Sequence, residues 1–186
     1  MKKNYKFINF KSLFFKKIKK KEIQILRKER NRQSIRKTML DQKIISKAEQ
    51  IKWYKETQKE KDSKYLSIYY KNLIIGCASI KKISKINKNC TWGFFIFEKY
   101  FGNFGVIVEY KLIDYMFKKY NLYKIFGRTL STNVKILKIH KRFGFNIEGN
   151  LKNQIFINNK KYDLILSSLY KKDWDKNKKR IKLLFM

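Results

Sequence analysis

Residues 98–145 constrain the fold more than any other part of the chain. The stretch opens with a loop, Tyr100 to Gly105, in which two glycines and one asparagine can adopt positive φ. Val106 to Tyr120 follows without a break, and its apolar residues recur at spacings of three and four, which predicts a helix. Free loop amides and the positive end of a helix dipole together predict a phosphate site. An ordinary loop that enters an ordinary core helix is the alternative.

A second unit completes the same stretch. Residues 123–130 alternate as a strand, and Asn133 with its two hydroxyl-bearing neighbours offers N-cap side chains for a helix over residues 134–140. Asn133 and His140 are seven residues apart, so a helix places both side chains on nearly the same face. Gly144, between two phenylalanines, stands in the position of a helix C-cap.

This order of loop, helix, strand, asparagine, histidine and Phe-Gly-Phe resembles the GNAT superfamily of N-acetyltransferases, over about residues 24–174. The resemblance implies an α+β fold of the GNAT type, with a central mixed, mostly antiparallel sheet of about seven strands and about four flanking helices. It also implies a single acetyltransferase domain over residues 1–174, followed by a basic C-terminal tail over residues 175–186 with Trp174 as its anchor.

The rest of the chain supplies further strands and helices. We expect strands at residues 5–10, 64–70, 72–83, 89–97, 151–157 and 160–170, and helices at residues 19–31, 36–39 and 46–59. Ser46, with Glu49 three residues later, predicts a capping box at the start of the last of these helices. Asn158 and Asn159 between two alternating segments predict a tight hairpin turn.

The resemblance implies acetyl-CoA as the cofactor. In the superfamily the loop reads Gln/Arg-x-x-Gly-x-Gly/Ala, whereas this chain has Tyr100, Asn103 and Gly105, so two of the three signature residues depart. The implied cofactor-binding residues are Phe95, Ile96, Phe97, Gly102, Asn103, Phe104, Gly105, Val106 and Asn133. A backbone N–H among the first three would stabilise the oxyanion, and the loop amides would hold the pyrophosphate. Asn133 would bind the CoA arm, with helix capping as its alternative role.

The implied reaction is direct attack of a neutral amine on the thioester in a ternary complex. His140 stands where the superfamily usually has tyrosine, and a histidine side chain exchanges protons near neutrality, so it would protonate the leaving thiolate. A half-buried helix residue bonded to a carbonyl is the alternative for His140. Ser79 matches a substrate-side serine and could equally be a strand hydroxyl. Arg128 stands where sugar-acetylating relatives tend to carry an acidic residue near the amine, which leaves the acceptor open.

A narrower resemblance concerns the acceptor. The chain is similar to the nucleotide-sugar N-acetyltransferases of pseudaminic acid synthesis, which acetylate the 4-amino group of UDP-4-amino-4,6-dideoxy-N-acetyl-β-L-altrosamine. It rests on Arg30-Asn31, the strand over residues 74–79, Trp92-Gly93, residues 140–149 and the closing residues 162–174. The substrate-binding residues that it implies are Arg30, Asn31, Arg36, Met39 and Lys152. Ribosomal-protein and polyamine acetyltransferases share much of the pattern and are the alternatives, and a homodimer is open.

The net charge of +33 invites a nucleic-acid hypothesis, because lysine and arginine neutralise phosphates. The basic residues are spread over the whole chain, and lysine outnumbers arginine 40 to 7, which favours the residue usage of an A+T-rich genome. We therefore expect no nucleic-acid partner, although a basic protein on a degenerate acetyltransferase scaffold is an alternative of another class. The shortage of acidic residues, 14 in all, argues against a polyamine acceptor.

Length and cysteine content limit the class further. A chain of 186 residues favours one domain with a substantial core. No apolar run approaches the length of a membrane span, and the N-terminus lacks the features of a signal peptide, so we expect a cytoplasmic protein. Cys77 and Cys90 are far apart and there is one histidine, which predicts two free thiols and no metal site.

Overall fold

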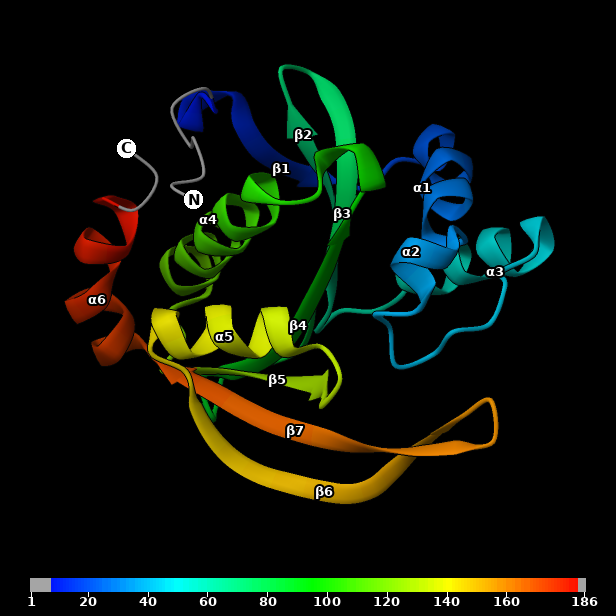
Figure 1. The fold of residues 1–186 in the computed structure, drawn as a ribbon. Coiled ribbons are helices and arrows are strands. Elements are labelled where there is room, and N and C mark those ends of the chain that lie inside the picture. The colour runs from blue at the N-terminus through cyan, green and yellow to red at the C-terminus, as the bar shows by residue number, and fades with distance from the viewer. Residues whose placement is uncertain (1–7, 184–186) are drawn as a thin grey trace.

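A single sheet organises the chain. The computed structural model describes residues 8–183, and within them seven strands lie in the order β1-β2-β3-β4-β5-β7-β6 (Figure 1). Every neighbouring pair is antiparallel except β4 and β5, which are parallel. The strands are β1 (Leu13–Lys17), β2 (Lys64–Tyr70), β3 (Leu73–Ser84), β4 (Asn89–Ile96), β5 (Lys124–Leu130), β6 (Asn146–Ile157) and β7 (Lys160–Tyr170). The predicted mixed, mostly antiparallel sheet is confirmed.

Helices cover both faces of the sheet. One face carries α1 (Ile23–Arg30), α2 (Gln33–Arg36) and α3 (Lys47–Thr57), and the other carries α4 (Asn103–Tyr120), α5 (Val134–Phe143) and α6 (Lys171–Leu183) (Figure 1). Three short 3-10 turns add η1 (Phe10–Ser12), η2 (Lys20–Glu22) and η3 (Glu98–Tyr100). The described part of the chain thus has six α-helices where about four were expected. None of these helices combines the length and the apolar character needed to cross a membrane.

Each face of the sheet has its own core. The larger core fills the space between the sheet and α4–α6, and α4 contributes Ile107, Leu112 and Met116, all fully buried. The smaller core lies under α1 and α3 and contains Leu26, Tyr65 and other residues. Side chains alternate along a strand, so the core to which a strand residue belongs identifies the face toward which it points.

Local sequence signals fix the ends of several elements as predicted. Gly144 ends α5 with φ of 92°, a left-handed conformation that glycine adopts without steric cost. Asn158 and Asn159 have φ of 48° and 59°, which a two-residue type I′ hairpin turn requires. Ser46 and Glu49 form the predicted capping box of α3, each side chain accepting a hydrogen bond from the other residue's backbone N–H.

Both ends of the chain differ from the expectation. Of the strand expected at residues 5–10, residues 5–7 lie outside the described part, and Phe10 begins a 3-10 turn instead. The expected basic tail from residue 175 is part of helix α6, which continues to Leu183. Trp174 and Ile181 are both 0% exposed, and their spacing of seven residues places them on one helix face against the core. This apolar pair orders a segment whose other residues are mostly basic.

A buried carboxylate ties the first helical segment to the sheet. Glu22, 3% exposed, accepts hydrogen bonds from Ser67 Oγ at 2.7 Å, from Lys19 N at 2.9 Å and from the Tyr69 hydroxyl. Burial alone would raise the pKa of the Glu22 carboxyl, but these hydrogen bonds outweigh it and hold that pKa below its usual range.

Glu22→Gln is therefore expected to lower the free energy of unfolding at pH 7 by about 2 kcal/mol, because hydrogen bonds to a charged acceptor are lost. A lowered carboxyl pKa stabilises the fold above the unfolded-state pKa of about 4.3, and this stabilisation is lost as pH falls through the folded value. Urea unfolding from pH 7 down to about pH 3 should thus show a constant difference between wild type and variant above about pH 4.3 and a shrinking difference below it. Glu56→Gln, on the exposed surface of α3, is the matched control. A difference that stays constant with pH would contradict the assignment.

Candidate active site

A wedge opens in the sheet between β4 and β5. These strands pair over only three positions, the last of which joins Thr91 to Phe126. Beyond this vertex β4 continues to Ile96 beside β3, and β5 continues to Leu130 beside β7 (Figure 1). The edges that face each other across the wedge therefore lack strand partners, so their backbone groups are available to a ligand.

The β4 edge of the wedge presents backbone N–H groups. Phe97 N donates to Ile75 O of β3 at 2.7 Å, so this amide points away from the wedge. N–H groups of an antiparallel strand alternate between its two sides, which directs the Phe95 amide toward β3 as well and the Ile96 amide toward the wedge. Of the three residues expected to supply an oxyanion donor, Ile96 has the right orientation, and Phe95 and Phe97 do not.

His140 lies over the vertex on the face covered by α4–α6. Trp92 and Gly127 are the first residues past the vertex on β4 and β5, and a side chain on Gly127 would meet Trp92 Nε1 at 3.7 Å. The His140 ring stacks on Phe145 with centroids 4.5 Å apart and lies 6.0 Å from the Trp92 ring. His140 thus lies next to the point where the sheet opens.

The polar partners of His140 come from two other elements. Its Nε2 lies 3.2 Å from Glu109 Oε1 of α4, and its Nδ1 lies 3.5 Å from Ser167 Oγ of β7. Ser167 pairs with Gly127 across β5 and β7, which places it beside the vertex. His140 is 6% exposed and Glu109 0% exposed. His140 is therefore buried against a carboxylate, and is not a half-buried residue bonded to a carbonyl.

The glycine loop forms the start of α4. The helix begins at Asn103, three residues earlier than expected, and Gly102 is its N-cap with φ of 94°. Gly105 lies inside the first turn, so Gly102 is the one position of the expected three that uses positive φ. In helical geometry the amides of residues 102–105 have no partner within the helix, whereas Val106 donates to the carbonyl of Gly102. The first turn contains no acidic side chain.

Asn133 occupies the N-cap position of α5, but its side chain makes no capping hydrogen bond. The alternative role expected for Asn133, helix capping by its side chain, is therefore not observed. Half-buried Asn133 lies at the opposite end of α5 from His140.

Ser79 and Arg128 lie on the other face of the sheet from His140. Ala78 and Ile80 belong to the core under α4–α6, so Ser79 between them points toward α1–α3. Ile125 belongs to the same core, which places Arg128, three positions further on, on the α1–α3 face, where it is exposed. The three residues expected to be catalytic are thus divided between the two faces, and only His140 lies over the vertex.

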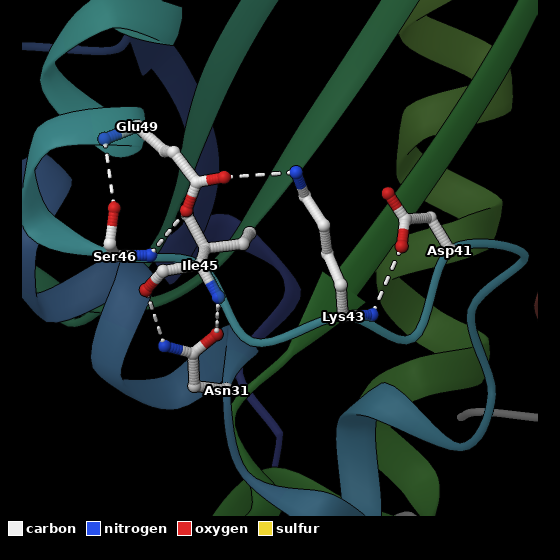
Figure 2. Close-up of polar contacts among 6 residues, drawn as sticks. All are labelled: Asn31, Asp41, Lys43, Ile45, Ser46 and Glu49. Atoms are coloured by element: carbon white, nitrogen blue, oxygen red, sulfur yellow. Dashed lines mark hydrogen bonds and ion pairs between the residues drawn. The ribbon is translucent and has the colours of Figure 1, made fainter.

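Three of the expected substrate-binding residues hold a loop in place. Asn31 donates from Nδ2 to Ile45 O at 2.8 Å and accepts from Ile45 N at 2.9 Å, as Figure 2 shows. Arg30 donates to Asp41 O at 2.6 Å, and Arg36 donates to Gln42 O at 3.2 Å. These contacts fix residues 37–46, the connection that leads to α3.

The other two expected substrate residues differ in place and setting. Half-buried Met39 lies in the same connection, and exposed Lys152 lies on β6. Strand β6 is at the opposite edge of the sheet from β1.

Glu109, Trp92 and Ser167 were not among the predicted site residues. A signal for Glu109 exists in the sequence, since it interrupts the apolar run of α4 directly after Ile107 and Val108. A carboxylate on the buried face of a core helix needs a partner, and the apolar periodicity of the segment conceals this need.

The sequence matches the model of a known protein family. The family model described as Acetyltransferase (GNAT) domain matches residues 15–166. The chain therefore belongs to the GNAT acetyltransferase family. The resemblance to this superfamily is confirmed. The expected fold and the expected cofactor, acetyl-CoA, are confirmed with it.

Individual relatives support the fold and differ in their acceptors. "Putative ribosomal N-acetyltransferase YdaF" of Bacillus subtilis (strain 168) is 26% identical over 113 residues, which cover 60% of this chain and 61% of that protein. The match thus spans about three fifths of the relative's length. Spermidine N-acetyltransferase from Vibrio cholerae in complex with CoA and spermine has a TM-score of 0.82 at 19% identity, over 88% of this chain and 98% of that chain. A dodecameric structure of spermidine N-acetyltransferase from Vibrio cholerae has a TM-score of 0.75 at 18% identity, over 88% and 96%.

These structural similarities show the same fold. None of the three relatives is named for a nucleotide sugar, so the narrower expectation of a pseudaminic acid enzyme gains no support from them.

Proposed function

We propose that this protein transfers the acetyl group of acetyl-CoA to the N-terminal amine of a protein, in the wedge between β4 and β5. The observation that supports a thioester site is the vertex itself. Two strand edges part there, the Ile96 amide faces the gap, and His140 lies over it. The thioester carbonyl accepts a hydrogen bond from Ile96 N–H as charge develops on its oxygen.

The CoA pyrophosphate is held at the start of α4. The amides of residues 102–105, which have no partner within the helix, and the helix dipole favour a negative charge, and no acidic side chain in the first turn opposes it. Exposed Gly102 adopts a backbone conformation that directs the chain around this position without a side chain in the way.

Gly105→Ala gives a test with two effects of opposite sign. A Cβ on Gly105 would meet only Ile96 Cδ1, at 3.8 Å, so alanine fits and should raise the free energy of unfolding by about 0.8 kcal/mol. The same methyl group would stand among the amides that bind the pyrophosphate, and we expect acetyl-CoA affinity to fall about tenfold, or about 1.4 kcal/mol. Urea unfolding and calorimetric titration with acetyl-CoA measure the two effects. Unchanged affinity in a stabilised variant would remove the first turn of α4 from the site.

The acetyl group passes directly from sulfur to nitrogen. Burial raises the pKa of both the Cys77 and the Cys90 thiol to about 12, so neither offers a thiolate nucleophile near neutral pH. A neutral amine attacks the carbonyl carbon, and His140 supplies the proton that the leaving thiolate needs.

Net charge favours a protein acceptor over a polyamine among the acceptors that the relatives suggest. A protein of net charge +33 repels a polyamine but is attracted to a protein N-terminus presented beside RNA phosphates, as on a ribosome. A surface cavity of about 480 Å³ between α2 and η3 is lined by Arg32, Gln33, Ser34, Lys37 and Glu98. Its one carboxylate lies 4.0 Å from Arg32, so this cavity lacks the acidic lining that a polycation needs.

The nucleotide-sugar acceptor is less well supported. Of Arg30, Arg36 and Lys152, which would hold the diphosphate, the two arginines already donate to carbonyls of the loop, as Asn31 does beside them. Arg30 Nη1 and Arg36 Nε have no hydrogen-bond partner among residues 8–183, but both atoms are buried, so a diphosphate would reach them only after the loop moves.

CoA release from acetyl-CoA, measured against three acceptors, tests the proposal. The acceptors are a peptide with a free ribosomal-protein N-terminus, spermidine, and a UDP-linked amino sugar, and the control is the same peptide with a blocked N-terminus. We expect kcat/KM for the free peptide to exceed that for spermidine by about tenfold or more, equivalent to about 1.4 kcal/mol. Faster turnover of spermidine or of the sugar would overturn the acceptor and leave the acetyltransferase assignment standing.

A further inference from the structure

Glu109 is a fully buried carboxylate with one charge partner. Both of its oxygens are inaccessible to solvent and accept no hydrogen bond of good geometry from residues 8–183. The His140 ring lies beside it, with 3.2 Å between Nε2 and Oε1. Fully buried Ile107 and Val108 precede Glu109 in the same helix turn. A carboxylate in such surroundings is strongly unfavourable unless a proton or a cation accompanies it.

The orientation of His140 follows from this contact. Nε2 points to α4, which leaves Nδ1 directed toward Ser167 and the vertex of the wedge. The groups that face the ring are Glu109 from α4, Ser167 from β7, Trp92 from β4 and Phe145 after α5. Of these, only Glu109 carries a charge. The basic residues of α5 itself, Lys135, Lys138, Lys141 and Arg142, are all exposed.

We infer that Glu109 is the positioning residue that keeps a proton on His140 and turns Nδ1 toward the leaving sulfur. The catalytic part of this inference rests on the proposed function, whereas the Glu109–His140 pair can be tested without any acceptor. Nothing in the family resemblance assigns a role to Glu109.

The proton balance of the transfer is complete with this pair. The amine nitrogen forms a bond to the thioester carbon, and the carbon–sulfur bond breaks with its electron pair on sulfur. Sulfur takes the proton from Nδ1 of the imidazolium, and the neutral ring then takes the proton that the newly acylated nitrogen sheds. Glu109 stays anionic throughout and favours the cationic ring at each turnover.

The chain has a single histidine, so His140 can be observed alone. Protein without a histidine tag, labelled with ¹³C-histidine, gives one imidazole signal whose chemical shift is followed against pH by NMR. Glu109→Gln removes the anion with little change of shape, and we expect the midpoint of the His140 titration to fall by about one pH unit or more. Asp114→Asn is the matched control, because it makes the same charge change on α4 at a residue that contacts Trp174 and Lys118 instead.

The titration has clear opposing outcomes. Equal midpoints in wild type and Glu109→Gln, or a wild-type ring that stays neutral down to pH 5, would overturn the inference. If Glu109→Gln fails to fold, Glu109→Asp keeps the charge and withdraws it by one methylene. A smaller fall of the midpoint in that variant supports the pair, and an unchanged midpoint counts against it.

Turnover measurements then show whether acetyl transfer depends on the Glu109–His140 pair. The measurement uses an amine that the protein acetylates and compares kcat for Glu109→Gln with kcat for wild type. The ionisation of the acceptor affects both values equally, so it cancels in their ratio. We expect this ratio to be about 0.1 at pH 8 and to rise as the pH is lowered, with KM for acetyl-CoA changed less than about twofold. A deficit that is constant with pH would mean a purely structural role. Failure to find the acceptor would sink the proposed function but would leave the NMR result intact.

Discussion

Replacing Gly76 with alanine is expected to lower the free energy of unfolding by about 3 kcal/mol, at the upper end of the cost of overpacking. A Cβ at Gly76 would lie 2.2 Å from Phe95 O and 2.9 Å from Ile96 Cα. Both atoms belong to the backbone of β4, so no side chain can rotate away. The variant can accommodate its methyl group only if β3 and β4 separate at this point.

Gly93→Ala is the control for this experiment. Gly93 lies on β4 opposite Ser79, and a Cβ there would meet nothing within 4 Å. Urea unfolding should therefore show a change within about 0.5 kcal/mol for Gly93→Ala. In a thermal melt Gly76→Ala should unfold about 6–12 °C below wild type. Equal stability of Gly76→Ala and wild type would contradict the register of β3 and β4.

The same contact bears on the active site. Phe95 and Ile96 are the backbone that Gly76 allows to approach, and the Ile96 amide is the proposed oxyanion donor. A displacement of β4 by even a few tenths of an ångström would move this amide relative to the thioester. We therefore expect Gly76→Ala to lose acetyl transfer even at temperatures at which it is folded.

Features set by local chemistry could be predicted from the sequence. The turn at Asn158-Asn159, the end of α5 at Gly144 and the capping box of Ser46 each depend on residues within four positions of one another. The strands and the larger helices followed from apolar periodicity. The loop at Gly102 was only partly predictable, because Asn103 and Gly105 can adopt positive φ but extend the helix instead.

Features that depend on partners distant in sequence could not be read in the same way. The partner of His140 is 31 positions away on another helix, and nothing local to either residue indicates the contact. Asn31 carries the same side chain whether it binds a sugar or holds Ile45. Helix α6 illustrates an intermediate case, since Trp174 and Ile181 have helical spacing but stand among basic residues that suggest a solvated tail.

Replacing His140 with phenylalanine is expected to impair both turnover and stability. Turnover should fall about 100-fold if the proton for the thiolate comes from this ring. The free energy of unfolding should fall by about 3–5 kcal/mol, because Glu109 would be left as an unpaired buried charge. The phenyl ring itself fits the stack on Phe145, so loss of packing contributes little. Steady-state kinetics and urea unfolding at pH 8 measure the two quantities.

The double variant His140→Phe with Glu109→Leu separates the two effects. Leucine removes the uncompensated charge and fills a similar volume, so most of the lost stability should return, as it does when buried ion pairs are replaced by apolar groups. Turnover should stay about 100-fold below wild type, because no side chain at the vertex can then supply the proton. If the double variant regains wild-type turnover together with stability, His140 serves only to neutralise Glu109. If it regains stability alone, the ring over the wedge is part of the chemistry, and the buried pair exists to keep that ring charged and in place.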